Sequence, residues 1–123
     1  MSEKQVMKIL KSLKPKKSYG FDGITSELLK LGADVLIVPL TYMVNFSILK
    51  GEFPYNWKSS KIVPVLKKGD KKFMKNYRPV SLLPVAGMIL EKSVAIQIEE
   101  YFEKNELLGK FYNFSNMSLI LQA

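Results

Sequence analysis

The 123-residue sequence contains no cysteine and no histidine. Their absence excludes thiol catalysis, disulfide bonds, zinc fingers and Ser-His-Asp triads, each of which needs at least one of these residue types. The first residues also lack the continuous apolar stretch of a secretory signal sequence. We therefore expect an intracellular protein without a metal site of its own.

Long hydrophobic runs are also lacking. The most apolar stretch, residues 35–49, is interrupted by Pro39, Asn45 and Ser47, and it is too short for a helix that spans a membrane. It predicts a buried helix instead, so we expect no membrane partner. No repeat or low-complexity segment is present.

The charged residues that the sequence does contain are grouped in blocks along the chain. With 123 residues, 47% of them hydrophobic, the chain is long enough to form one domain. Most of the net charge of +8 comes from residues 1–17 and 58–78, whereas residues 86–106 are mainly acidic. This distribution predicts one basic and one acidic side.

Hydrophobic spacing and turn residues predict an α+β fold, mainly helical, with a short antiparallel β-hairpin. Helices are expected at residues 3–13, from Thr25 or Ser26 to Leu31, at 33–50 and at 86–105. The expected strands are residues 61–66 and 77–83.

The connection between the two strands carries the candidate binding site. Its cations are Lys67, Lys68, Lys71, Lys72, Lys75 and Arg78, and Asp70 is the only acid among them. Clustered positive charge of this kind is typical of a surface that binds nucleic acid or nucleotide phosphate. A solvated face that discourages edge pairing of the strands explains the same pattern.

Other polar and aromatic residues have local explanations. Asp22 precedes Gly23, which favours a turn and capping role over catalysis. The aromatic residues Phe53, Tyr55 and Trp57 have two interpretations, core packing and stacking on bases, of which burial statistics favour packing.

An ordered set of motifs identifies a family resemblance. The set comprises Lys14-Pro15-Lys16-Lys17-Ser18 with Gly20, Asp22, Gly23 and Ile24; Gly51-x-Phe53-Pro54-x-x-Trp57-Lys58; Ile62-Val63-Pro64-Val65; Lys67-Lys68-Gly69-Asp70; Asn76-Tyr77-Arg78-Pro79-Val80-Ser81-Leu82-Leu83; and Ile89-Leu90-Glu91-Lys92. In this order, over about residues 10–108, they resemble the front part of non-LTR retrotransposon reverse transcriptases, which are RNA-directed DNA polymerases.

The resemblance implies a fingers-like subdomain, part of an incomplete right-hand polymerase, over residues 1–110, followed by a divergent tail at 111–123. In that family, the positions that match Lys67 and Arg78 contact the triphosphate of the incoming deoxynucleotide, although Lys68 could take the place of Lys67. Lys68, Lys71, Lys72 and Lys75 are then the expected contacts to RNA or DNA.

The resemblance also marks what is missing. The family holds two Mg²⁺ ions with palm carboxylates that include a Tyr-x-Asp-Asp hairpin, and no such hairpin occurs here. The tail keeps aromatic residues but lacks the family's Gln, Gly and Arg. We therefore expect a truncated retroelement fragment, without a catalytic residue or a cofactor, that binds nucleic acid at most. The alternatives are a protein-interaction module, self-associating through exposed apolar helices, and a relic without function.

Overall fold

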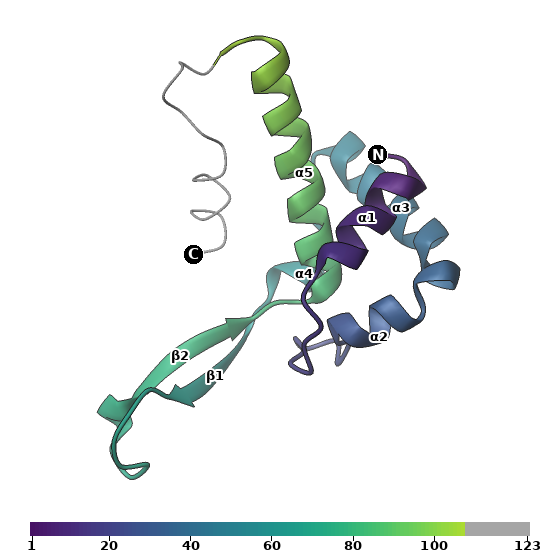
Figure 1. Ribbon diagram of the computed structural model, residues 1–123. Coiled ribbons are helices and arrows are strands. Elements are labelled where there is room, and N and C mark those ends of the chain that lie inside the picture. The colour runs from purple at the N-terminus through teal and green to yellow at the C-terminus, as the bar shows by residue number, and fades with distance from the viewer. Residues whose placement is uncertain (108–123) are drawn as a thin grey trace.

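A helical body and a projecting β-hairpin make up the computed structural model, which describes residues 1–107 (Figure 1). The predicted divergent tail at 111–123 lies outside the described residues. The predicted α+β class is confirmed, since helices dominate and the two strands of the hairpin are antiparallel.

The first helix, α1 (Glu3–Ser12), begins at a capping box in which Ser2 and Gln5 exchange side-chain and backbone hydrogen bonds. Such a box satisfies amide groups that the first turn of a helix leaves unpaired. Val6, Ile9 and Leu10 are buried on one face of α1. They form the centre of the core together with residues of the helices at 33–50 and 85–104.

Two further helices follow a turn. Helix α2 (Ser26–Leu31) is capped by Thr25, whose hydroxyl accepts a hydrogen bond from the Leu28 amide. Helix α3 (Ala33–Lys50) ends at Gly51, which has a left-handed φ of 66°. Glycine adopts that conformation without the steric penalty of a Cβ atom.

The hairpin consists of β1 (Lys61–Leu66) and β2 (Tyr77–Leu82), with the short 3-10 helix η1 (Met74–Asn76) in the connection. Before it lies the short helix α4 (Tyr55–Lys58), which the sequence did not predict. Lys61 pairs with Leu82 at one end of the ribbon and Leu66 with Tyr77 at the other.

The last described helix, α5 (Val85–Lys104), returns to the body and packs against α1 and α3. Its first half is well buried, because Val85, Ile89 and Leu90 are at most 3% exposed. Farther along, Ile98 is 41% exposed and Tyr101 is 61% exposed. Within the described residues, the apolar face of α5 is therefore buried only over its first half.

The prediction of a buried helix at residues 35–49 is only partly correct. Its inner face, which includes Ile37, Leu40 and Val44, is buried, but Val35 and Leu49 are 80% and 84% exposed. By length and composition α3 is also the one described helix that could cross a membrane, and 33% of it is buried. Within the described residues, α3 is therefore not a mostly buried core helix.

Candidate nucleic-acid interface

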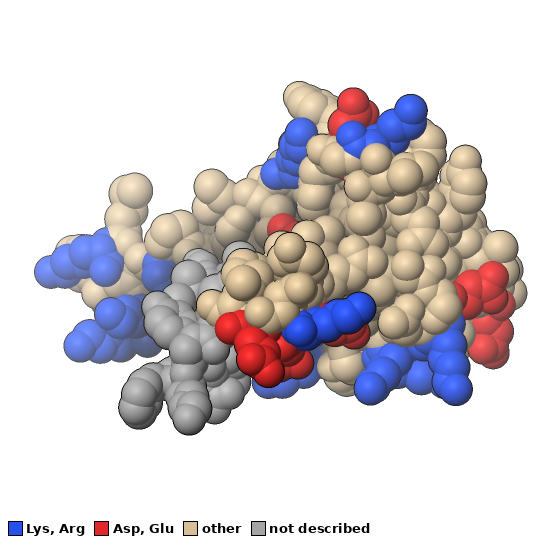
Figure 2. Space-filling view, turned by 90° about the horizontal axis from the view of Figure 1, so that it is seen from above, with Lys and Arg blue, Asp and Glu red and all other residues tan. Residues whose placement is uncertain are grey.

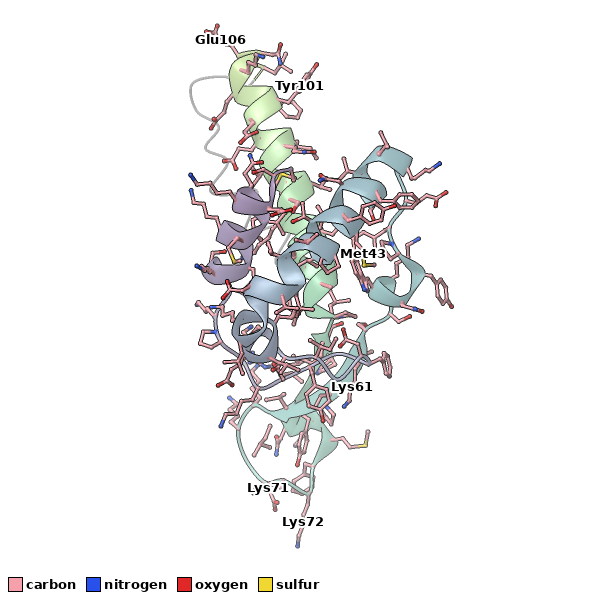
Figure 3. The ribbon with its side chains drawn as sticks, turned by 90° about the vertical axis from the view of Figure 1, so that its right-hand side faces the viewer. Met43, Lys61, Lys71, Lys72, Tyr101 and Glu106 are labelled. Carbon is pink, nitrogen blue, oxygen red and sulfur yellow. The ribbon has the colours of Figure 1, made fainter. Side chains whose placement is uncertain are left out.

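All six predicted cationic contacts lie on the hairpin and are exposed: Lys67, Lys68, Lys71, Lys72, Lys75 and Arg78. Figure 3 shows Lys71 and Lys72 at the end of the hairpin farthest from the helices. The strands therefore carry the positive charge away from the body, where solvent and a large ligand both have access.

The register of the ribbon relates Lys67 to Arg78. Arg78 is paired with Val65, and the ladder continues past β1 because the Lys67 amide donates to the Asn76 carbonyl oxygen at 2.7 Å. Side chains alternate along a strand, so Lys67 shares the face of Val65 and Arg78. Lys68 lies in the bend that follows. Lys67 and Arg78 are then diagonal neighbours on the ribbon, a relationship that places their Cα atoms about 7–8 Å apart.

Polar residues fix the loop that bears the lysines. The Asp70 carboxylate accepts a hydrogen bond from the Lys72 amide at 3.0 Å, the Asn76 side chain donates to the Asp70 carbonyl at 2.8 Å, and the Tyr77 hydroxyl donates to the Lys71 carbonyl at 2.9 Å. Gly69 has a φ of 87°. The single acid of the segment thus shapes the turn.

The loop also presents an aromatic side chain among the cations. Phe73 is 55% exposed, and the Lys75 ammonium lies over its ring, 5.5 Å from the centroid. Met74, the next residue, is 91% exposed. Sequence reasoning missed Phe73, although its position between the Lys71-Lys72 pair and Lys75 was a signal that could have identified it.

The other aromatic residues divide between packing and exposure. The rings of Phe53 and Trp57 meet edge to face at 6.4 Å, and both pack against the core cluster. Tyr55 is 79% exposed. Packing is therefore the observed state of Phe53 and Trp57, whereas Tyr55 lies on the surface.

The turn before α2 contacts the base of the hairpin. Asp22 accepts a hydrogen bond from the Ile24 amide at 3.1 Å, and Gly23 has a φ of 71°, so the predicted turn role of Asp22 is confirmed. The Lys61 ammonium lies 4.9 Å from the centroid of the Tyr19 ring. This cation–π contact joins β1 to the helical body.

The face of the molecule in Figure 2 does not divide into a basic and an acidic side. On the face in Figure 2, basic side chains alone gather over the hairpin at the left, whereas basic and acidic side chains alternate over the helices. The predicted division into one basic and one acidic side is wrong for this face. The hairpin is where positive charge accumulates, with Asp70 as its single acid.

The described residues contain no group of three or more acidic side chains that could hold a metal ion. A magnesium site of the polymerase type needs several carboxylate oxygens in one place. Residues 1–107 do not fit such a site, and no catalytic step is assigned to them.

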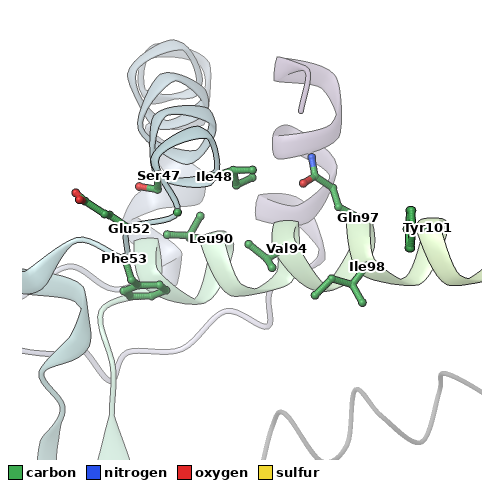
Figure 4. A pocket seen from close by; sticks show the side chains of 10 residues that line it. Ser47, Ile48, Glu52, Phe53, Leu90, Val94, Gln97, Ile98 and Tyr101 are labelled. Carbon is green, nitrogen blue, oxygen red and sulfur yellow. The ribbon is translucent and has the colours of Figure 1, made fainter.

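A second surface feature is a groove of 440 Å³ beside α5. Figure 4 shows its walls: Ser47 and Ile48 at the end of α3, Phe53 after it, and Leu90, Val94, Ile98 and Tyr101 along α5. Most of these side chains are apolar. The groove is therefore suited to protein contact and lacks the cations that phosphate requires.

Sequence comparisons relate the chain to retrotransposon proteins. The chain is 31% identical over 108 residues to the RNA-directed DNA polymerase from mobile element jockey of Drosophila funebris, a match that covers 87% of this chain and 12% of the relative. Over 95 residues it is 30% identical to the transposon TX1 uncharacterized 149 kDa protein of Xenopus laevis, covering 77% of this chain and 7% of the relative.

A putative 115 kDa protein in the type-1 retrotransposable element R1DM of Drosophila melanogaster is 33% identical over 90 residues, which is 72% of this chain and 9% of the relative. Over most of its length, this chain is similar in sequence to non-LTR retrotransposon reverse transcriptases, at about 30% identity. No family model matches it. The chain spans about an eighth or less of the length of these relatives.

Proposed function

We propose that the chain is the fingers part of a retroelement RNA-directed DNA polymerase and that its hairpin binds the phosphates of RNA or DNA. One observation carries the proposal: six exposed cations on one ribbon and its loop, with Lys67 and Arg78 diagonal on a common face. Polyanion binding draws mainly on such clustered lysine and arginine side chains.

Within the complete polymerase, Lys67 and Arg78 would contact the triphosphate of the incoming deoxynucleotide. A guanidinium group forms paired hydrogen bonds with phosphate oxygens, and an ammonium group supplies a compact charge beside it. Together they would stabilise negative charge on the transferring phosphoryl group. Magnesium would be held by carboxylates elsewhere in the polymerase, since residues 1–107 bring no suitable group together.

A titration of a fluorescein-labelled 12-nucleotide single strand, followed by anisotropy from low to moderate salt, tests phosphate binding. If all six cations neutralise phosphates, the logarithm of the affinity falls with the logarithm of salt concentration with a slope of about −4. An affinity that does not change with salt would refute the proposal.

The location of the binding site needs charge-matched variants. Two triple variants each lower the net charge of +8 by three. The hairpin variant is Lys67→Gln/Lys71→Gln/Lys72→Gln. The control variant, on the helices, is Lys30→Gln/Lys50→Gln/Lys104→Gln. The hairpin variant is expected to reduce the slope by about 2, while the variant on the helices leaves it nearly unchanged. Equal losses in both variants would mean that net charge, and not the hairpin, determines binding.

The second candidate function is a protein-interaction surface, favoured by the groove beside α5 and by the exposed outer face of α3. Exposed apolar patches of this kind mark contacts with other polypeptide segments or with a second copy. Size-exclusion chromatography with and without the oligonucleotide distinguishes the candidates. Oligomers that nucleic acid does not alter support the interaction surface.

A further inference from the structure

Phe73 stands out on the hairpin because an apolar ring is held in solvent at the tip of a charged loop. Its side chain is 55% exposed and does not belong to the core cluster. Large aromatic side chains usually bury most of their surface. An exposed ring among cations therefore indicates a contact with a ligand that has both charged and aromatic parts.

The loop backbone fixes the base of this side chain. The Phe73 amide donates to the Asp70 carbonyl at 3.3 Å, and the Phe73 carbonyl accepts from the Asn76 amide at 3.1 Å. Asn76 is itself bonded to Asp70 through its side chain. Hydrogen bonds hold the backbone on both sides of Phe73 in the turn. Binding of a ligand to the ring therefore costs little conformational entropy of the loop backbone.

The surroundings of the ring define the ligand. Lys75 lies over the ring, with its ammonium 5.5 Å from the centroid, and among the described residues it is the one cation in such contact with Phe73. Lys71 and Lys72 are exposed on the same loop. A nucleotide offers a flat base for an aromatic ring and a phosphate for neighbouring ammonium groups.

We propose that Phe73 is a stacking platform for an unpaired base of RNA or DNA, so that the hairpin prefers single strands to duplexes. The proposal rests on the proposed function, because the same lysines hold the phosphates. Bases inside a duplex are already stacked on their neighbours, and their faces are not available to the ring. Stacking adds a preference that charge alone does not provide.

The test measures binding of the full chain to four fluorescein-labelled ligands at one salt concentration: a 12-nucleotide oligo(U), a 12-nucleotide oligo(dT), an abasic 12-mer and a blunt 12-base-pair duplex. The abasic strand keeps the phosphates and removes the bases. The parent chain is expected to bind oligo(U) or oligo(dT) about tenfold more tightly than the abasic strand. Comparison of oligo(U) with oligo(dT) shows whether the site prefers the RNA or the DNA oligomer.

The key variants are Phe73→Leu, which keeps an apolar side chain without the ring, and Phe73→Trp, which enlarges the ring. Phe73→Leu is expected to weaken oligomer binding about tenfold and to leave abasic and duplex binding within twofold, whereas Phe73→Trp retains or strengthens oligomer binding. Tyr55→Leu removes a more exposed aromatic side chain, 79% accessible, from outside the hairpin. It should leave all four affinities unchanged.

Two results would overturn the inference while leaving phosphate binding intact. One is equal binding of the abasic strand and the oligomers by the parent chain, and the other is oligomer binding by Phe73→Leu that matches the parent. Loss of binding to all four ligands by the parent chain would instead refute the proposed function, and the inference with it. Because Phe73 lies outside the core cluster, circular dichroism should show unchanged helix content in both Phe73 variants.

Discussion

Asn76 closes the hairpin loop on Asp70, with its side-chain amide 2.8 Å from the Asp70 carbonyl oxygen. A Cβ atom at Gly69 would lie 2.8 Å from that same amide nitrogen, so the closure requires glycine as well as asparagine. Gly69 and Asn76, which carry no charge, position the lysines of the loop. Mutation can therefore change the shape of the loop without changing its charge.

Asn76→Ala is the variant that separates them. It leaves the net charge unchanged and removes one side-chain hydrogen bond, which is worth about 1 kcal/mol. We expect faster amide hydrogen exchange in the loop and a severalfold weaker affinity for a single-stranded oligonucleotide, with an unchanged salt slope. Asn56→Ala, on an exposed position of α4, is the control. Loop exchange identical to that of the parent would contradict this account of the loop.

A second close approach, between Gly20 and Pro84, ties the turn before α2 to the start of α5. A Cβ atom at Gly20 would lie 2.8 Å from the Pro84 nitrogen and 3.0 Å from the Leu83 carbonyl carbon. Both are backbone atoms, which have little room to move. We expect Gly20→Ala to lower the free energy of unfolding by about 1–3 kcal/mol in urea titrations.

The matched control for Gly20 is Gly32→Ala. There the nearest atom to a new Cβ is a terminal carbon of Leu36, at 3.2 Å, and a flexible side chain rotates away. The expected change is within about 0.5 kcal/mol. If both variants lose the same stability, steric contact with Pro84 is not the reason for glycine at position 20.

The local structure was largely predictable from local signals. Thr25 as an N-cap, Gly51 as a helix end and the strand at residues 61–66 all follow from chemistry within a few neighbouring residues. The short helix α4 was not predicted because four residues carry no measurable hydrophobic period. The class of the fold followed from the order of these elements.

The arrangement in space was less predictable. The outer face of α3 carries Val35 and Leu49, and apolar composition alone does not tell which face of a helix meets the core. The cations of the hairpin were predictable as a cluster, but the position of Phe73 among them depends on the turn built by Asp70 and Asn76. Such contacts form only when the loop folds back on itself, and no periodic pattern in the sequence reveals them.

The core offers a direct test of the fold. Leu10 is fully buried between helices, whereas Leu31, at the end of α2, is 86% exposed. Leu10→Ala is expected to lower the free energy of unfolding by about 2–5 kcal/mol, because it leaves a cavity. Leu31→Ala should cost less than about 0.5 kcal/mol. Urea or thermal unfolding followed by circular dichroism measures both, and similar losses would mean that the helices pack differently.

The last prediction concerns the common face of Lys67 and Arg78. Two groups that hold one polyanion are coupled, so the effect of Lys67→Gln should depend on whether Arg78 is present, by about 0.5–3 kcal/mol in a double-mutant cycle. Lys68, which carries the same charge in the bend beyond the ladder, should act independently of Arg78. Binding of deoxythymidine triphosphate, followed by NMR chemical shifts, gives the affinities. Additive effects of Lys67 and Arg78 would show that they do not share the triphosphate, whatever the charge of the loop contributes.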